Sequence, residues 1–172
     1  MRKLSMDELG RMSVADFKIA PKKPIVVVMD QIRSMHNVGS VFRTADAFLI
    51  NGICLCGFTP QPPHRDIHKT ALGATESVDW MYYEQTTDAV IALKNQGYKV
   101  YAIEQTEGSI PLNQFAKTEE PIAFVFGNEV DGVDQLVIEL CDGVIEIPQW
   151  GMKHSLNISV AAAVVLWEFV RS

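Results

Sequence analysis

The sequence lacks several features that would assign the protein to a special class. Cysteine is scarce, and Cys54, Cys56 and Cys141 form an odd set without metal-site spacing, which favours reduced thiols in a cytosolic core. The longest apolar run near the C-terminus, Val160 to Trp167, is far shorter than the roughly 20 residues that cross a bilayer. The polar N-terminus has no signal-peptide core. We therefore expect a cytoplasmic protein that does not enter a membrane.

Recognisable metal sites and phosphate-binding loops are missing as well. His64 and His68 are one helical turn apart, but neither an HExxH glutamate nor a third ligand accompanies them. We expect both histidines at the surface and no bound metal. The glycine fingerprint GxGxxG is also absent, which disfavours a plain Rossmann-type nucleotide binder.

Length and charge set further bounds. The 172 residues suit one domain with a full-sized core, and 48% of them are hydrophobic. The net charge of −6 alone argues against a nucleic-acid partner, but its distribution is uneven. Residues 1–75 contain ten Lys/Arg and six Asp/Glu, whereas residues 76–172 contain five and fifteen. A basic first half could therefore face phosphates while the second half faces solvent.

Residues 1–23 are predicted to form a basic N-terminal arm that precedes a single domain at 24–172. Ser5 and Glu8 have the spacing of a capping box, which predicts a short amphipathic helix from Ser5 to Met12 or beyond. The basic residues of the arm are Lys3, Arg11, Lys18, Lys22 and Lys23. Packing or a dimer contact, and contact with RNA, both remain open as roles for this arm.

Apolar, strand-like runs alternate with helical patterns through the domain. The predicted strands cover residues 25–29, 53–58, 78–83, 98–103, 122–126 and 144–147, and the predicted helices cover 38–49, 86–96, 136–141 and 156–170. Residues 104–120 are predicted to form an acidic linker with a helical turn near Pro111. The alternation indicates an α/β fold with a mostly parallel sheet and helices on both faces.

The helix after the first strand has two different faces. Its apolar stripe consists of Val38, Val41, Phe42, Ala45, Phe48 and Leu49. The opposite face carries Gly39, Ser40, Arg43 and Ala47. Arg43 therefore stands on a face of small residues, where another backbone or a phosphate could approach closely.

The C-terminal stretch combines a polar loop with an apolar helix. Pro148 ends the strand because it has no N–H to donate, and Ser155 or Asn157 can cap the following helix. That helix is apolar almost all round, so we expect it to be buried on most sides. The polar residues hung at its entrance are Lys153, His154, Ser155 and Asn157.

Ligands of open α/β sheets bind outside the carboxyl ends of the strands. This rule indicates Asp30–Asn37, Glu104, Gly127–Gly132 and Pro148–Asn157 as the candidate site. Three of these four segments carry recognisable motifs.

The first motif runs from Asn37 to Ala45 and reads N-V-G-S-V-F-R-T-A. The second runs from Val125 to Gly132 and reads V-F-G-N-E-V-D-G. The third is Ile147-Pro148 followed by S-L-N-I-S-V-A from Ser155 to Ala161. In this order they resemble the motifs of the SPOUT superfamily, specifically the SpoU or TrmH type of RNA ribose 2′-O-methyltransferases. The resemblance covers residues 24–171, and residues 150–154 fill a loop that varies in the family.

The resemblance implies a deep trefoil knot at the C-terminus, whose crevice holds S-adenosylmethionine mainly through main-chain groups. By carry-over, Gly127, Ile147, Pro148 and Leu156 should bind this cofactor. The resemblance also implies a homodimer that pairs the knot regions of two subunits. The small-residue face around Gly39, Ser40 and Ala47 could lie near that seam.

The implied reaction transfers a methyl group to a ribose 2′-hydroxyl of tRNA or rRNA. Such a hydroxyl is a poor nucleophile, so a group must take its proton or a cation must stabilise the developing alkoxide. The family assigns this task to the arginine at position 43, which we interpret as a phosphate and alkoxide stabiliser because arginine stays charged. The residues expected to orient Arg43 and the ribose are Asn37, Glu129, Ser155 and Asn157. Helix-dipole placement of Glu129 and simple capping by Ser155 and Asn157 are plainer roles.

Two other functions fit the same scaffold. One is a SPOUT methyltransferase that acts on a base, which the set of Asn37, Arg43, Glu129 and Asn157 argues against. The other is a non-catalytic RNA- or ribosome-binding protein, which loss of Arg43 or Glu129 would have favoured. For RNA recognition we expect contributions from the basic arm, the loops and a partner subunit.

Overall fold

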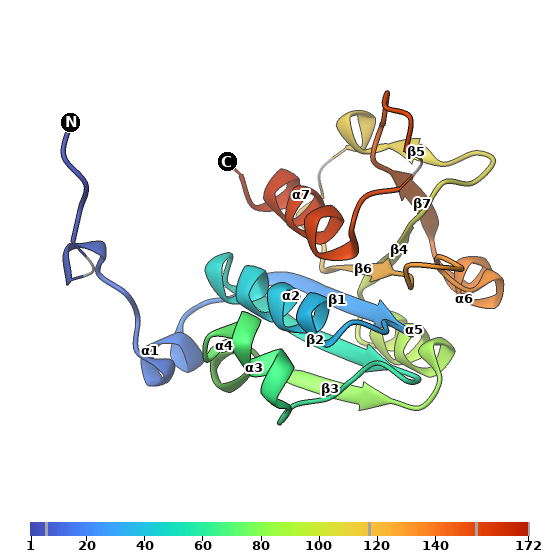
Figure 1. Cartoon of the computed structure of the whole chain (residues 1–172). Helices are drawn as coiled ribbons and strands as arrows, with labels where there is room; N and C mark the ends of the chain where they lie inside the picture. Colours follow the sequence, from blue (N-terminus) through green and yellow to red (C-terminus); the bar gives the residue numbers. More distant parts are fainter. Residues whose placement is uncertain (6, 117, 154, 172) are drawn as a thin grey trace.

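The computed structural model describes residues 1–5, 7–116, 118–153 and 155–171 (Figure 1). Within these residues, seven strands form one sheet in the order β3-β2-β1-β6-β4-β7-β5, and all neighbouring strands are parallel. The strands are β1 (Lys23–Asp30), β2 (Ile50–Cys56), β3 (Trp80–Tyr83), β4 (Lys99–Ile103), β5 (Ile110–Pro111), β6 (Ile122–Phe126) and β7 (Gly143–Glu146). The predicted parallel α/β fold is confirmed.

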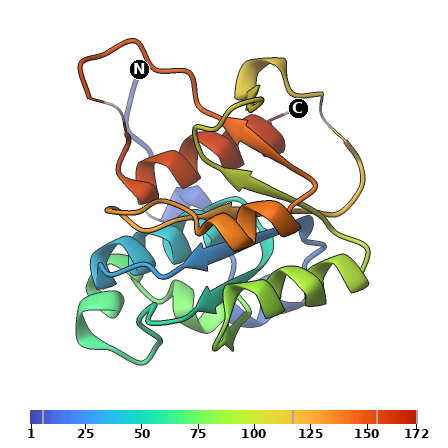
Figure 2. The same ribbon diagram turned by 90° about the vertical axis from the view of Figure 1, so that its right-hand side faces the viewer.

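Helices cover both faces of the sheet. They are α1 (Val14–Ile19), α2 (Met35–Ala47), α3 (Arg65–Ala71), α4 (Ala74–Ser77), α5 (Thr86–Asn95), α6 (Gln135–Leu140) and α7 (Ile158–Val170), with 3-10 helices η1 (Asp7–Leu9) and η2 (Leu112–Gln114). One core lies between the sheet and α1 to α4 with α7, and the other lies under α5 and α6. Figure 2 views the molecule from the side of α5 and α6.

The central strand β1 shows why the sheet is buried on both faces. Ile25, Val27 and Met29 point into the core under α2 and α7, whereas Val26 and Val28 point into the core under α5. Successive side chains of a strand point to opposite faces, so a continuous apolar run needs cover on both sides. The β-branched run at residues 25–29 therefore correctly predicts a strand that is covered on both faces of the sheet.

The N-terminal arm differs from the predicted helix over Ser5–Met12. The Ser5 N–H does donate to Glu8 Oε2 at 2.7 Å, but this contact closes only the short 3-10 helix η1, and Gly10 follows with a φ of 57°. The true α-helix is α1, where the Asp16 N–H donates to Ser13 Oγ at 3.1 Å in a capping box. Phe17 anchors α1 in the core.

The segment 104–120 also differs from its prediction, because it adds an edge strand to the sheet. Ile110 and Pro111 form β5, which runs parallel to β7 with Ile110 opposite Ile145. A proline is tolerated at such an edge because the missing N–H faces no partner strand. Only the helical turn near Pro111, observed as η2, was predicted.

Helix α7 begins after the Asn157 cap, and one of its faces is exposed. Val160 and Trp167 are 49% and 57% exposed, and Val164 lies with them on the same face. The prediction of burial is thus wrong for one face of the helix in the single chain. Among the helices of the described residues, none is long and apolar enough to cross a membrane.

Candidate active site

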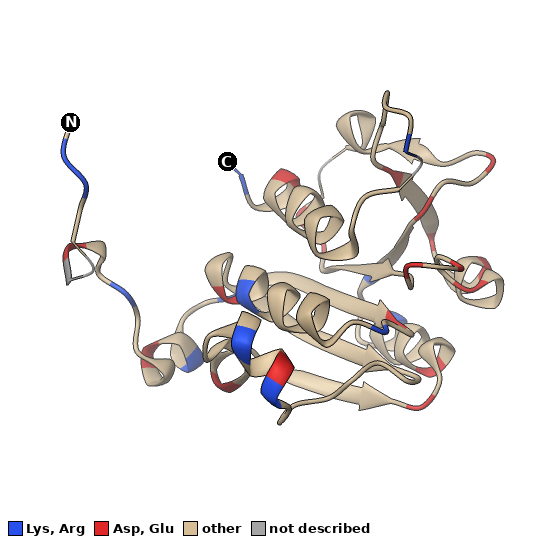
Figure 3. Ribbon diagram, viewed as in Figure 1, with Lys and Arg blue, Asp and Glu red and all other residues tan. Residues whose placement is uncertain are grey.

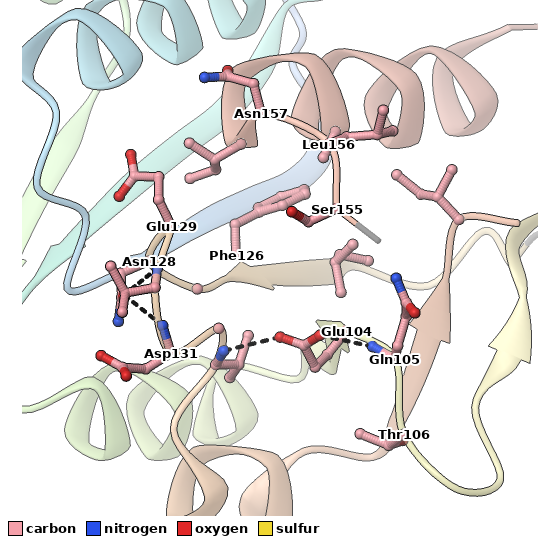
Figure 4. Close-up of a pocket in the computed structure, with 18 of the residues that line it drawn as sticks. Glu104, Gln105, Thr106, Phe126, Asn128, Glu129, Asp131, Ser155, Leu156 and Asn157 are labelled. Carbon is pink, nitrogen blue, oxygen red and sulfur yellow. Dashed lines mark hydrogen bonds between the residues drawn. The ribbon is translucent and has the colours of Figure 1, made fainter. Parts of the chain in front are cut away.

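A crevice of about 620 Å³ lies at the carboxyl ends of β4, β6 and β7 (Figure 4). Glu104 and Gly127 line it from the ends of β4 and β6. Ile147 lines it after β7, and Ser155 and Leu156 line it just before α7. The crevice therefore lies outside the carboxyl ends of the strands, where ligands of open α/β sheets bind.

The loop after β6 is tight because two glycines permit it. A Cβ on Gly127 would lie 2.0 Å from the carbonyl carbon of Gly132, and Gly132 itself has a φ of 72°. Asn128 and Gly132 exchange two backbone hydrogen bonds of 3.1 Å. The Oδ1 of Asn128 also accepts from the N–H groups of Val130 and Asp131, both at 2.9 Å. This folding leaves the side chain of Glu129 exposed at the loop tip.

Glu104 fixes this loop from the floor of the crevice. Its Oε2 accepts from the Val133 N–H at 3.1 Å, and its Oε1 accepts from the Gln105 N–H at 2.8 Å. A Cβ on Gly132 would lie 2.2 Å from Glu104 Oε2, so the glycine makes room for the carboxylate. Glu104 therefore holds the loop and adds a carboxylate to the lining of the crevice.

A hydrogen-bonded chain joins the three motif segments at the mouth of the crevice. The Nδ2 of Asn37, on α2, donates to Glu129 Oε1 at 2.7 Å. The Nδ2 of Asn157 donates to Asn37 Oδ1 at 3.2 Å. Asn157 Oδ1 in turn accepts from the Ser159 backbone N–H at 2.9 Å and from Ser159 Oγ at 2.7 Å. Asn157 thus caps α7 and belongs to the network at the same time.

Arg43 does not join this network and does not line the crevice as the structure describes it. Helix geometry explains the separation from Asn37. Six residues along an α-helix correspond to a rise of about 9 Å and a rotation of about 240°. Arg43 instead lines a second cavity of about 630 Å³ between α2, α3 and α7, together with Lys69, Ser159 and Trp167.

Helix α3 covers part of the small-residue face of α2. A Cβ on Gly39 would lie 2.1 Å from Thr70 Oγ1 and 2.3 Å from the Ile67 carbonyl oxygen. The close backbone approach predicted for this face is therefore made by α3 of the same chain, so Gly39 is not free to face a second subunit. Ser40 and Arg43 remain open to the second cavity.

The two cavities differ in charge. Among the described residues, the crevice is lined by the carboxylates Glu104, Glu129 and Asp131 and by no lysine or arginine. The second cavity is lined by Arg43 and Lys69 and, over the same described range, by no carboxylate. The Asn157–Ser159 hydrogen bonds lie between them, because Asn157 lines the crevice and Ser159 lines the second cavity.

Other predicted site residues have mixed outcomes. Pro148 is not among the described lining residues of the crevice, and Gln149 lines it instead. His154 lies outside the described residues. Sequence reasoning did not anticipate Lys69 and Ser159 as companions of Arg43. Ser159 could have been found from its position two residues after the capping Asn157.

The three cysteines are protonated thiols that form no disulfide. Burial raises the pKa of the Cys54 and Cys141 thiols to about 12 and raises that of Cys56 further, so all three are neutral thiols near pH 7. The three cysteines are free. In the parts of the chain that are described, no group of three His, Cys, Asp or Glu side chains could hold a metal ion.

Comparison with known proteins identifies the family. A sequence profile of the SpoU rRNA methylase family matches residues 24–167. The chain belongs to the SpoU rRNA methylase family. The family resemblance inferred from the three motifs is therefore confirmed.

Individual SpoU-family relatives are longer than this chain. A putative TrmH family tRNA/rRNA methyltransferase of Staphylococcus saprophyticus is 32% identical, over 92% of this chain and 63% of that protein. A 23S rRNA (guanosine-2′-O-)-methyltransferase of Vibrio parahaemolyticus is 32% identical, over 95% of this chain and 66% of that protein. The chain thus spans less than two thirds of the length of these curated relatives.

A solved structure of an rRNA methyltransferase shares the fold. The crystal structure of an AdoMet-bound rRNA methyltransferase from Sinorhizobium meliloti matches with a TM-score of 0.80 and 26% identity. The match covers 86% of this chain and 56% of that chain.

Proposed function

We propose that the protein transfers a methyl group from S-adenosylmethionine to a ribose 2′-hydroxyl of tRNA or rRNA. The observation that carries this proposal is the pair of adjacent cavities of opposite charge, joined at the Asn37–Glu129–Asn157 network. Membership of the SpoU family and the ribose-methylating relative support it. We propose that residues 24–172 act as one methyltransferase domain and that residues 1–23 act as a basic arm.

The crevice fits the proposed cofactor in size and charge. Its volume lies within the roughly 300–1,000 Å³ of small-molecule sites. S-Adenosylmethionine carries a positive sulfonium, and Glu104, Glu129 and Asp131 make the walls acidic without a competing cation among the described lining residues. Gly127, Ile147 and Leu156 would hold its uncharged parts. Pro148 is also proposed as a contact, because it follows Ile147 directly in the chain after β7. When bound, the cofactor supplies an activated methyl group.

The protein's own groups would act on the acceptor ribose at the boundary of the two cavities. Arg43 would bind an RNA phosphate and stabilise charge on the 2′-oxygen while the hydroxyl proton passes to solvent water, and the donor that loses its methyl group would leave as S-adenosylhomocysteine. Asn37 and Asn157 would orient the ribose, because each presents an amide fixed by the network, and Glu129 would hold Asn37 in place. Ser155 would contact the ribose from the crevice side. Such a transfer depends mainly on positioning, which a rigid hydrogen-bonded network supplies.

We further infer that two copies of the chain form a homodimer through α7. The exposed apolar residues Val160, Val164 and Trp167 form one face of the helix and also line the Arg43 cavity. Covering this face with a second copy would remove apolar surface from water and would exclude water from the guanidinium of Arg43. Electrostatic stabilisation by that group would then be stronger.

The proposal also includes a knotted C-terminus. Strand β7 is inserted between β4 and β5, and the chain then returns to pack α7 beside α2. The likeness to SPOUT-type structures supports a knot at this place. Cytoplasmic residence is proposed as well, with the three free, neutral thiols in support.

Calorimetry with S-adenosylhomocysteine and methyl transfer to bulk tRNA and rRNA test the proposal together. We expect one binding site per chain, and radioactive methyl groups that remain on ribose after digestion to nucleosides. Folded protein that shows no binding at millimolar ligand would remove the enzymatic function and favour a non-catalytic RNA-binding protein. Methyl groups recovered on bases would indicate a base methyltransferase.

Light scattering tests the dimer. We expect a dimer at micromolar concentration and a monomer for Val164→Glu, which places a charge in the proposed interface. The exposed Ile91→Glu on α5, away from the proposed interface, is the matched control and should remain dimeric. A wild-type monomer at this concentration contradicts the proposal.

A further inference from the structure

A third cavity, outside the proposed catalytic region, combines an aromatic wall with cations. This groove has a volume of about 610 Å³, and we call it the α3 groove. One side of the groove is lined by the cations Arg65 and Lys69 and by the histidines His64 and His68. Trp80 of β3 lines it from the sheet. Pro62, Pro63 and Ile67 form its apolar lining, and Thr75 and the carboxylate of Glu76 complete the groove.

The α3 groove lies in the basic part of an acidic protein. Figure 3 shows Lys and Arg segments following one another on neighbouring parts of α2 and α3, whereas acidic segments gather around α5 and α6. Residues 76–172 contain fifteen acidic and only five basic residues, so they repel a polyanion. A polyanionic ligand of this chain would therefore be directed to the α2–α3 side.

Asp66 is the one carboxylate on α3, and Lys69 is its ion-pair partner. Lys69 Nζ donates to Asp66 Oδ1 at 2.7 Å. That hydrogen bond lowers the pKa of Asp66, and the charges of Lys69, His36 and His64 add to the effect. The pair is exposed, and exposed ion pairs are weak, so Lys69 can exchange Asp66 for a phosphate.

We propose that the α3 groove binds one nucleotide of the RNA substrate, away from the ribose that is methylated. The base would lie against Trp80 and the prolines, and the flanking phosphates would contact Arg65 and Lys69. Unstacked RNA bases are commonly held by aromatic side chains, and phosphates by basic ones.

Placement supports a link between this groove and the reacting site. Lys69 lines both the α3 groove and the Arg43 cavity, so the two are neighbours across one side chain. Thr70 Oγ1 donates to the His36 carbonyl oxygen at 3.0 Å, which fixes α3 against α2 near Asn37. An RNA strand could thus run from the α3 groove over Lys69 to Arg43. This inference rests on the proposed RNA substrate and assigns it a second contact.

Arg65→Gln tests the phosphate contact, and Lys99→Gln is its matched control. Both residues are exposed, and each change removes one positive charge, but Lys99 lies on β4 near Asp142. With fluorescently labelled bulk tRNA, we expect Arg65→Gln to raise Kd about threefold to tenfold and to lower the slope of log Kd against log salt by about 0.7–0.9. KM for RNA should rise while kcat and S-adenosylhomocysteine affinity stay unchanged.

Equal Kd values for Arg65→Gln and Lys99→Gln would contradict the proposal that the α3 groove binds RNA. Trp80 gives an independent readout in a chain carrying Trp150→Phe and Trp167→Phe, where it is the only tryptophan. Saturating bulk tRNA should quench its emission, whereas S-adenosylhomocysteine should not. Emission unchanged by RNA would overturn base contact in this groove. Because neither measurement requires methyl transfer, failure of the groove and failure of the proposed activity are distinguishable.

Discussion

The crevice and the Arg43 cavity have nearly equal volumes but opposite construction. Backbone turns and carboxylates form the crevice, where Gly127 and Gly132 let the loop close against Glu104. Side chains of three helices form the other cavity, which presents Arg43 and Lys69. A cationic methyl donor and a polyanionic acceptor would be sorted by charge to the two sides of Asn157. Under the proposed function, we expect that mutations can separate cofactor binding from RNA activation.

Arg43→Ala is expected to have the largest effect, and it tests whether the two regions act separately. We expect methyl transfer to fall on the order of a hundredfold or more, because a preorganised charge at the developing alkoxide is lost. Affinity for S-adenosylhomocysteine should stay within twofold, since Arg43 does not line the described crevice. Stability should change by less than about 0.5 kcal/mol because the side chain is exposed. Single-turnover methylation, calorimetry and thermal unfolding measure the three quantities.

Arg43→Lys refines the same test. Lysine keeps the charge but loses the planar fork that binds phosphate in two places. Substantial residual activity would indicate simple charge stabilisation. A near wild-type rate for Arg43→Ala would show that the site is assigned wrongly, with Glu129 or His154 the next residues to examine.

Gly127→Ala should damage the other region. The added methyl would lie 2.0 Å from the Gly132 backbone, so the loop must shift. Overpacking of this kind costs about 1–3 kcal/mol of unfolding free energy, and we expect cofactor affinity to fall about tenfold or more. Gly151→Ala is the control, because a Cβ there meets nothing within 4 Å. Normal affinity in Gly127→Ala would mean that the loop geometry does not shape the cofactor site.

Asn37→Asp acts on the network that joins the two regions. It places a second carboxylate beside Glu129, where the Asn37 amide now donates at 2.7 Å. The variant loses the hydrogen bond to the Glu129 carboxylate, so we expect its rate of methyl transfer to be about tenfold lower than that of the wild type. Like charges raise the pKa of one carboxyl, so protonation at lower pH should relieve the repulsion. The ratio of variant to wild-type rate should therefore rise from pH 8 to pH 6, and a flat ratio would argue against the contact.

The smallest effect on methyl transfer is expected at Thr86, behind the crevice. Its hydroxyl donates to the buried Asp30 Oδ1 at 2.5 Å, while Asp30 Oδ2 accepts from the Asp134 N–H at 3.0 Å. Thr86→Val leaves one carboxylate oxygen without this donor, which should cost about 1–3 kcal/mol in denaturant unfolding. Thr86→Ser is the control and should retain most of that stability. Methyl transfer by folded Thr86→Val should equal that of the wild type.

Local patterns predicted the sheet core and the site's strand ends. The apolar run of β6 was predicted over its observed range, and the strand-end rule placed Asn37, Glu129 and Asn157 near one another. Strand β5 was missed because two residues carry no periodicity and gain their pairing only from β7.

The arrangement around Arg43 depends on tertiary packing. Helical period could have separated Arg43 from Asn37, but the cover that α3 provides over Gly39 has no local signal. The α3 groove was not predicted either, since Trp80 and Lys69 belong to separate elements. The exposed face of α7 was missed because apolar composition was taken to mean burial within the single chain.

Mapping of 2′-O-methylated nucleotides tests the central claim most directly. RNA would be compared from cells that lack the protein, cells that express the wild type and cells that express Arg43→Ala. We predict that a ribose methyl group in tRNA or rRNA disappears with the protein, returns with the wild type and does not return with Arg43→Ala. An unchanged map of ribose methylation, or the loss of a base methyl group in its place, would contradict the account.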